Sequence, residues 1–268
     1  MHQSQPSFSP MDIAVGAHRV HARVGGEGPP MVLLHSLLAD DSSFDRIALP
    51  LARTHRVIML ALPGFGASER VDGGLEAVAD RVAGAIKGLN LTHQPLLLGN
   101  GYGGFVALLV AIRHPEIARR LILADCGAAF SEPGRTAFQG MSAAAKEKGL
   151  AAIADVAMRR LFSAEYQSTH PALVDERRKR FLAVDPQTFH NACAALSTLD
   201  LRSQIGAIGV PVLVLVGEHD EATPPAMSRE LAAGLPHAQL QVLSGCAHVP
   251  QLQDPELFLS AIKPFIGA

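Results

Sequence analysis

The stretch Leu96-Leu97-Leu98-Gly99-Asn100-Gly101-Tyr102-Gly103-Gly104-Phe105 decides the fold of this chain. A run of leucines ends in a cluster of small residues, and a helical pattern over 102–113 begins at once. A short apolar run of this kind indicates a buried strand, and glycines let a strand and a helix approach closely at a sharp turn. The sequence therefore predicts a strand that turns directly into a helix at Gly101.

Strand and helix signals alternate on both sides of this turn. Apolar runs of strand length occur at 13–24 (as a hairpin), 31–35, 56–60, 121–125, 210–217 and 239–243. Helical patterns fill most of the remaining intervals, notably 75–89, 226–234 and 255–266. Such alternation predicts an α/β fold with a mostly parallel sheet that helices cover on both faces.

The interval from about Cys126 to Leu201 lacks strand signals; it is rich in alanine and charged residues and has helical periodicity. Because strand signals resume after it, we expect one domain over residues 1–268 with a helical cap inserted at about 126–201. Ligands of open α/β sheets bind beyond the carboxyl ends of the strands, where this cap is expected to lie. Three arginines of the cap are able to meet a substrate carboxylate but are expected at the surface: Arg135, Arg159 and Arg160.

The charge pattern argues against nucleic acid as a partner. Lys and Arg number 23 against 25 Asp and Glu, which gives a formal net charge of −2. The one basic run, Arg177-Arg178-Lys179-Arg180, is interpreted as a solvated helix face.

Hydropathy and the cysteines indicate the compartment. No apolar segment is long enough to cross a membrane, and residues 1–10 are polar and lack the features of a signal peptide, so we expect a cytoplasmic protein. Cys126, Cys193 and Cys246 are odd in number and lack metal-type spacing. They are expected to be buried thiols in a reducing compartment.

Four segments resemble, in chain order, the functional segments of the α/β-hydrolase superfamily: His35-Ser36, Gly99–Gly103, Gly217–Asp220 and Gly245–His248. The order nucleophile, acid, histidine is the one that this fold uses. The resemblance implies that His248 is the base and that Asp220 orients it. It also implies an oxyanion hole made by the backbone amides of Ser36 and Tyr102.

A second acid competes with Asp220. Asp125 follows a predicted strand at a position where some members of the superfamily place the acid. Asp220 is favoured because it lies in the Gly-x-x-Asp pattern of the family, and Asp125 is then expected to bind loop amides. Ser36 is a further alternative as a replacement nucleophile, although a hydroxyl at that corner more often bonds to the backbone.

The second half of the chain is most similar to 3-oxoadipate enol-lactonases, in residues 180–186, 200–202 and 219–225. Residues 63–68, Pro-Gly-Phe-Gly-Ala-Ser, lean instead toward hydrolases of ring-cleavage products. The resemblance implies hydrolysis of a small ester, lactone or ring-cleavage product in the breakdown of aromatic compounds, with no cofactor and no metal. The expected partner is a small-molecule substrate, and the oligomeric state is left open.

The chain departs from the superfamily at the position of the nucleophile, where G-x-S-x-G has serine and this chain has Gly101. Loss of the nucleophile of a serine protease costs on the order of 10⁶ in turnover. Either a serine was replaced by design, or a natural glycine supports other chemistry. His248 would then activate a water or serve an acid–base reaction of a lyase or isomerase. A protein that binds a small ligand without turnover is the rival outside enzymes.

Overall fold

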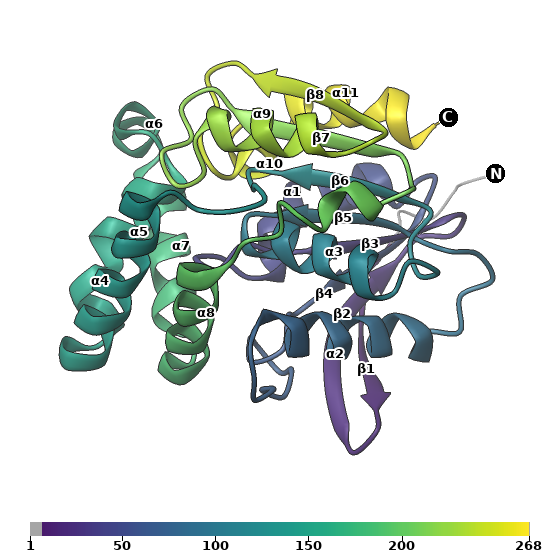
Figure 1. Ribbon diagram of the computed structural model, residues 1–268, viewed down its shortest axis with the longest axis horizontal. Helices are drawn as coiled ribbons and strands as arrows, with labels where there is room; N and C mark the ends of the chain where they lie inside the picture. Colours follow the sequence, from purple (N-terminus) through teal and green to yellow (C-terminus); the bar gives the residue numbers. More distant parts are fainter. Residues whose placement is uncertain (1–6, 268) are drawn as a thin grey trace.

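The computed structural model describes residues 7–267, so the expectation that residues 1–10 are no signal peptide lies largely outside it. Within the described residues, eight strands form one sheet in the order β1-β2-β4-β3-β5-β6-β7-β8 (Figure 1). The strands are β1 (Ser9–Val15), β2 (His18–Gly25), β3 (Pro30–Leu34), β4 (Arg56–Leu60), β5 (Leu96–Asn100), β6 (Arg120–Ala124), β7 (Val212–Gly217) and β8 (Ala238–Leu243). The β1–β2 and β2–β4 pairs are antiparallel, and every other pair is parallel.

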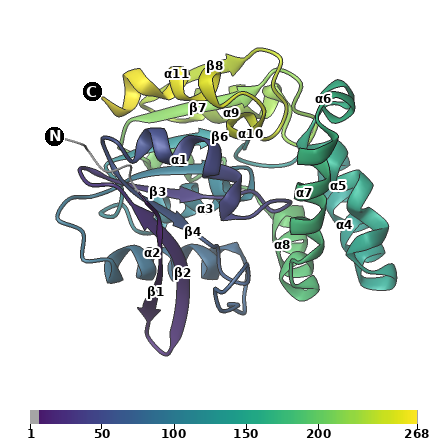
Figure 2. The same cartoon turned by 180° about the vertical axis from the view of Figure 1, so that it is seen from behind.

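Helices cover both faces of this sheet. Figure 1 shows α2 (Leu75–Gly88), α3 (Tyr102–Arg113) and α9 (Pro225–Gly234) in front of it. Figure 2 shows α1 (Asp45–Leu51) and α11 (Pro255–Ile266) on the other side. The remaining short segments are η1 (Asp41–Phe44), η3 (Ile205–Ala207) and α10 (Pro250–Gln253). The expected α/β fold, with a mostly parallel sheet covered on both faces, is confirmed.

The continuous apolar runs of the central strands follow from this double cover. All five residues of β3 are buried. Val32 and Leu34 belong to the larger core cluster, with α2 and α3. Met31 and Leu33 belong to the second cluster, with α1 and α11. Successive side chains of a strand point to opposite faces, so a strand between two helical layers needs apolar residues at every position.

A helical region separates β6 from β7, as the sequence predicts. It comprises α4 (Glu132–Lys148), η2 (Leu150–Ile153), α5 (Ala154–Leu161), α6 (Ala164–Thr169), α7 (Pro171–Leu182) and α8 (Pro186–Thr198). An isolated bridge between Ala129 and Asp200 brings its two ends together. Figure 1 shows these helices grouped at one end of the sheet.

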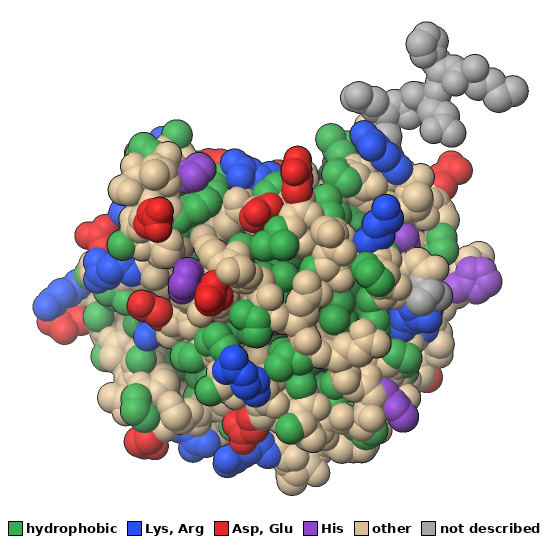
Figure 3. Space-filling model, turned by 90° about the horizontal axis from the view of Figure 1, so that it is seen from above, with side chains coloured by type: hydrophobic (Ala, Val, Ile, Leu, Met, Phe, Trp, Pro, Cys, Tyr) green, Lys and Arg blue, Asp and Glu red, His purple; other side chains and the backbone are tan. Residues whose placement is uncertain are grey.

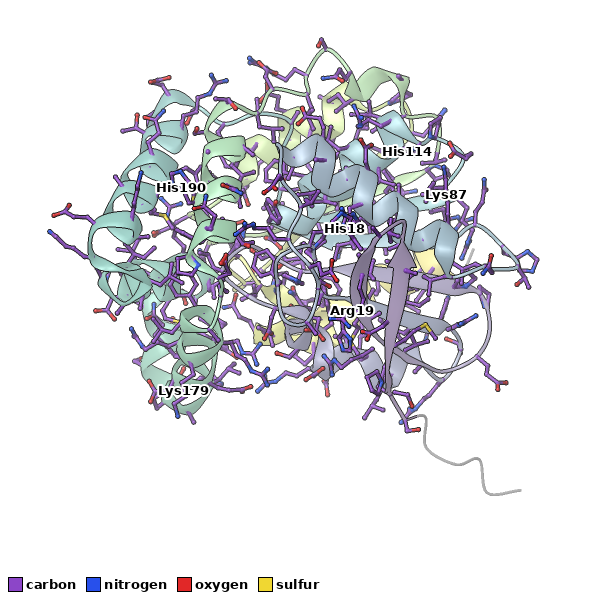
Figure 4. All side chains as sticks on the ribbon, turned by 90° about the horizontal axis from the view of Figure 1, so that it is seen from below. His18, Arg19, Lys87, His114, Lys179 and His190 are labelled. Atoms are coloured by element: carbon purple, nitrogen blue, oxygen red, sulfur yellow. The ribbon has the colours of Figure 1, made fainter. Side chains whose placement is uncertain are left out.

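The interpretation of residues 177–180 as a solvated face was wrong for Arg177. Its side chain is only 3% exposed, and Nη1 donates to Ser42 Oγ at 3.0 Å. Lys179, on the same helix, points outward in Figure 4. A buried guanidinium needs hydrogen-bond acceptors. Nη1 and Nη2 of Arg177 find them in Ser42 and Glu176, whereas Nε has no partner among the described residues, and the bond to Ser42 joins α7 to η1.

Element ends differ slightly from the expected ones. The hairpin begins at Ser9 rather than at Ile13, because its first residues pair with β2. Among the described residues, no helix combines the length and apolarity that crossing a membrane requires. Acidic and basic side chains are intermixed on the face in Figure 3.

Candidate active site

The turn after β5 has the backbone expected from the sequence. Gly101 adopts φ 54° and ψ −118°, in the left-handed half of the map, and α3 starts at the next residue. A Cβ on Gly103 would lie 2.1 Å from the carbonyl oxygen of Leu34, so only glycine allows α3 to pack this closely against β3. The turn therefore presents residue 101 at the carboxyl ends of the central strands.

His248 and Asp220 form the pair predicted from the sequence. His248 Nδ1 lies 2.9 Å from Asp220 Oδ2, and both side chains are buried. Asp220 Oδ1 accepts the amides of Ala222 (2.8 Å) and Thr223 (3.0 Å), and Thr223 Oγ1 donates to Oδ2 at 2.6 Å. Burial would raise the pKa of Asp220, but His248 and these donors hold it below its usual value. An ionised Asp220 requires the proton on Nδ1, which leaves Nε2 free to accept.

Ser36 is the residue that Nε2 meets. The hydroxyl of Ser36 lies 3.2 Å from His248 Nε2, and the side chain is buried. The expectation that this hydroxyl bonds to the backbone was wrong. It bonds to His248 instead, and Gly101 has no side chain that could stand between the two. A Cβ placed on Gly101 would lie 2.6 Å from Ser36 Oγ and 2.7 Å from His248 Nε2.

His35 fixes the corner of the backbone that carries Ser36. Its Nε2 accepts the amide of Leu62 at 3.1 Å, so its proton is on Nδ1, which donates to the Ser36 carbonyl at 2.9 Å. Burial lowers the pKa of His35, which favours this neutral form. Its ring also packs edge-on against Phe65 with centroids 4.8 Å apart. His35 thus holds Ser36 in place from below, without facing the cavity.

Asp125 lies next to the pair, and His248 does not bond to it. Asp125 Oδ1 accepts the amide of Gly217 at 2.8 Å; this amide is at the end of β7 rather than in a loop. Burial and the nearby charge of Asp220 raise the pKa of Asp125 well above its usual value. Asn100 Nδ2 donates to Asp125 Oδ2 at 3.3 Å and to the His248 carbonyl at 2.9 Å. This amide ties the end of β5 to the loop that carries the histidine.

One group among the described residues has the composition of a metal site. Asp125, Asp220 and His248 each offer a ligand atom within 4.8 Å of the others. Hydrogen bonding accounts for the group better, since His248 Nδ1 requires its proton to donate to Asp220 and would have to give that proton up to bind a metal. We assign no cofactor to the site.

A small cavity, of about 30 Å³, opens directly onto this chain of side chains. Ser36, Gly101, Tyr102, Thr223 and His248 line it from the sheet side. The helical region and its flanks contribute the opposite wall: Phe130, Phe138, Met141, Arg160 and Leu196. The inserted helices therefore lie over the carboxyl ends of the strands, above Gly101. A larger but open hollow, lined by residues such as Arg70 and Gln187, contains none of the residues of this chain.

A family model for the alpha/beta hydrolase fold matches residues 29–255. The chain belongs to this family. Within the α/β-hydrolase fold, 2-hydroxymuconate semialdehyde hydrolase of Pseudomonas sp. strain CF600 is 29% identical over 284 residues, which cover 99% of this chain and 96% of the relative. The solved enol-lactonase of Burkholderia xenovorans LB400 superposes with a TM-score of 0.90 at 28% identity, covering 96% of this chain and all of the other. A thermophilic esterase of Thermogutta terrifontis gives 0.86 at 27% identity, covering 97% and 98%.

The sequence did not single out Thr223 and Asn100 at this site, and it misjudged the exposure of Arg160. Thr223 follows Asp220 by three positions in one loop, a local signal that was readable. Asn100 precedes Gly101, but its bonds reach β6 and the loop of His248, which no local pattern reveals. Arg160 was expected at the surface, yet it is half-buried and lines the cavity. Its place depends on how the helical region folds back over the sheet.

Proposed function

We propose that this protein hydrolyses a small ester or lactone, with His248 as base, Asp220 as its orienting acid and backbone amides as the oxyanion hole. The observation that carries the proposal is the buried chain Asp220–His248–Ser36, with links of 2.9 and 3.2 Å, at the floor of a mostly apolar cavity. A histidine with one nitrogen bound to a carboxylate and the other facing the cavity is arranged to take and return a proton.

The oxyanion hole is assigned to the amides of Ser36 and Tyr102. Both residues line the cavity, and within residues 7–267 neither amide donates to a protein acceptor. Tyr102 is the first residue of α3, where the helix dipole favours negative charge. Two free donors beside the base suit the oxyanion of a tetrahedral intermediate.

Arg160 narrows the class of substrate. Arg160 lines a mostly apolar cavity, and within the described part of the chain no carboxylate lies at ion-pair distance from its guanidinium. Burial lowers the pKa of Arg160, and the nearby charges of Asp220 and Glu221 offset this only in part. A substrate that carries a carboxylate would offset the cost of burying this charge. The proposal therefore favours acidic esters and lactones, which include the type of compound that the breakdown of aromatic compounds yields.

Turnover in labelled water tests the proposed function. The protein is incubated with p-nitrophenyl acetate, short lactones and ring-cleavage products in H₂¹⁸O, and products are followed by mass spectrometry. Hydrolysis places ¹⁸O in the acid product and saturates with substrate concentration. Products free of ¹⁸O would indicate a lyase or isomerase, and calorimetric binding without turnover would indicate a binding protein; either result contradicts the proposal.

Arg160→Met is expected to raise KM about 10–100-fold for a carboxylate-bearing substrate, the effect of losing a charged hydrogen bond of about 1.5–3 kcal/mol. KM for neutral p-nitrophenyl acetate should change less than threefold. The matched control is Arg159→Met, because Arg159 is the exposed neighbour on the same helix. Equal effects of both substitutions, or equal effects on both substrates, would remove Arg160 from substrate binding.

A further inference from the structure

The Ser36 hydroxyl lies where a side chain on the elbow would stand. Its oxygen is 2.6 Å from the position of a Cβ on Gly101 and 3.2 Å from His248 Nε2. His248 Nε2 itself is 2.7 Å from that Cβ position. Ser36, in the loop after β3, and His248 thus occupy the space that an elbow side chain would need.

The hydrogen-bond pattern gives the Ser36 hydroxyl a direction. His248 Nδ1 carries the proton that it shares with Asp220, so Nε2 can only accept, and the proton donated to it comes from Ser36 Oγ. A hydroxyl bound in this way to a base that a carboxylate orients is the arrangement of an activated serine. Ser36 is buried, lines the cavity and is held from below by His35, so its position does not depend on solvent.

We propose that Ser36 is the catalytic nucleophile of this protein, supplied by the loop after β3 in place of the residue at the elbow. The inference rests on the proposed hydrolysis of esters or lactones. It replaces direct attack by water with a covalent acyl-serine intermediate, and it uses the base and the donors already present.

The covalent cycle balances with these residues alone. Ser36 Oγ attacks the acyl carbon while its proton passes to His248 Nε2, and the carbonyl oxygen becomes an oxyanion facing the amides of Ser36 and Tyr102. The bond to the leaving alkoxide breaks as that oxygen takes the proton from Nε2. Water then attacks the acyl-Ser36 ester and gives its proton to Nε2. The second intermediate collapses, the acid leaves, and Ser36 Oγ recovers the proton.

Labelling and turnover together test the assignment. The full-length protein is treated with a fluorophosphonate, digested and mapped by mass spectrometry; one adduct is expected, on the peptide that carries Ser36. His248→Ala should abolish the adduct. Ser36→Ala should abolish it too, and should lower kcat for p-nitrophenyl acetate at least about 10³-fold, because both backbone donors remain but the nucleophile is gone.

Ser142→Ala is the matched control. Ser142, on α4, is also buried, and its hydroxyl lies 2.6 Å from His190 Nδ1, but it does not line the cavity. Figure 4 shows His190 on the inserted helical region. This variant should keep both the adduct and the turnover of the parent. The control therefore tests whether a buried serine next to a histidine is enough for reaction, without a carboxylate that orients the histidine and without oxyanion donors.

Other outcomes divide the proposals. If kcat of Ser36→Ala stays within threefold of the parent value, Ser36 is not the nucleophile, whether or not the parent forms an adduct. The proposed hydrolase function then stands, with water as the attacking group. If the parent protein shows no turnover, the proposed function is contradicted. The fluorophosphonate labelling still tests whether Ser36 is a nucleophile. An adduct on Ser36 that requires His248 supports the assignment, and no adduct overturns it.

Discussion

Asp220→Asn should lower kcat for ester hydrolysis about 10⁴-fold with little change in KM. The carboxylate accepts the Nδ1 proton of His248 at 2.9 Å, and an amide that presents its NH₂ there would stabilise the tautomer with the proton on Nε2. Nε2 could then no longer accept a proton from Ser36 or water. Loss of the same acid in a serine protease has an effect of this size. Steady-state kinetics with p-nitrophenyl acetate provides the measurement.

Asp125→Asn is the control that separates the two acids. Burial raises the pKa of Asp125, so this carboxyl holds its proton more tightly than Asp220 does. The amide oxygen of an asparagine can still accept from the Gly217 amide. We expect kcat to fall less than tenfold. A loss near 10⁴-fold in Asp125→Asn, with a small loss in Asp220→Asn, would move the functional acid to the end of β6.

Gly101→Ala should lower kcat at least about 10²-fold and destabilise the fold. The new Cβ would lie 2.6 Å from Ser36 Oγ and 2.7 Å from His248 Nε2, so the two must move apart, and misplacement by about 1 Å can cost about 10²-fold in rate. A non-glycine residue at φ 54° costs about 1–3 kcal/mol, and overpacking adds about 1–3 kcal/mol. Urea denaturation should show a lower midpoint with an unchanged slope.

Gly101→Ser adds the same Cβ together with a hydroxyl, and its comparison with Gly101→Ala isolates that hydroxyl. Equal losses in the two variants would show that the elbow position no longer serves as a nucleophile. Turnover that recovers in Gly101→Ser, with the fluorophosphonate adduct on the peptide that carries residue 101, would show that the elbow still accepts a serine. Full activity in Gly101→Ala would contradict the tight packing of Ser36 and His248 around this glycine.

The sequence by itself determined the fold and the pairing at its centre. Strands covered on both faces are mainly apolar, so β3, β7 and the three leucines of β5 are legible as short continuous runs. The turn at Gly101 was legible because close packing of a helix on a strand leaves room only for glycines. His248 and Asp220 follow strands β8 and β7, and the carboxyl ends of parallel strands meet at one edge of the sheet, which brings the pair to 2.9 Å.

Only the tertiary structure decided which groups face His248 Nε2 and the cavity. Ser36 reaches the histidine across 212 positions of sequence, and the two side chains meet where a side chain on Gly101, on a third segment, would otherwise lie. The burial of Arg160 and Arg177 depends on how the inserted helices lie over the strands. Charged side chains on helices give no local sign of such burial, because periodicity identifies the apolar face of a helix and not what covers its polar one.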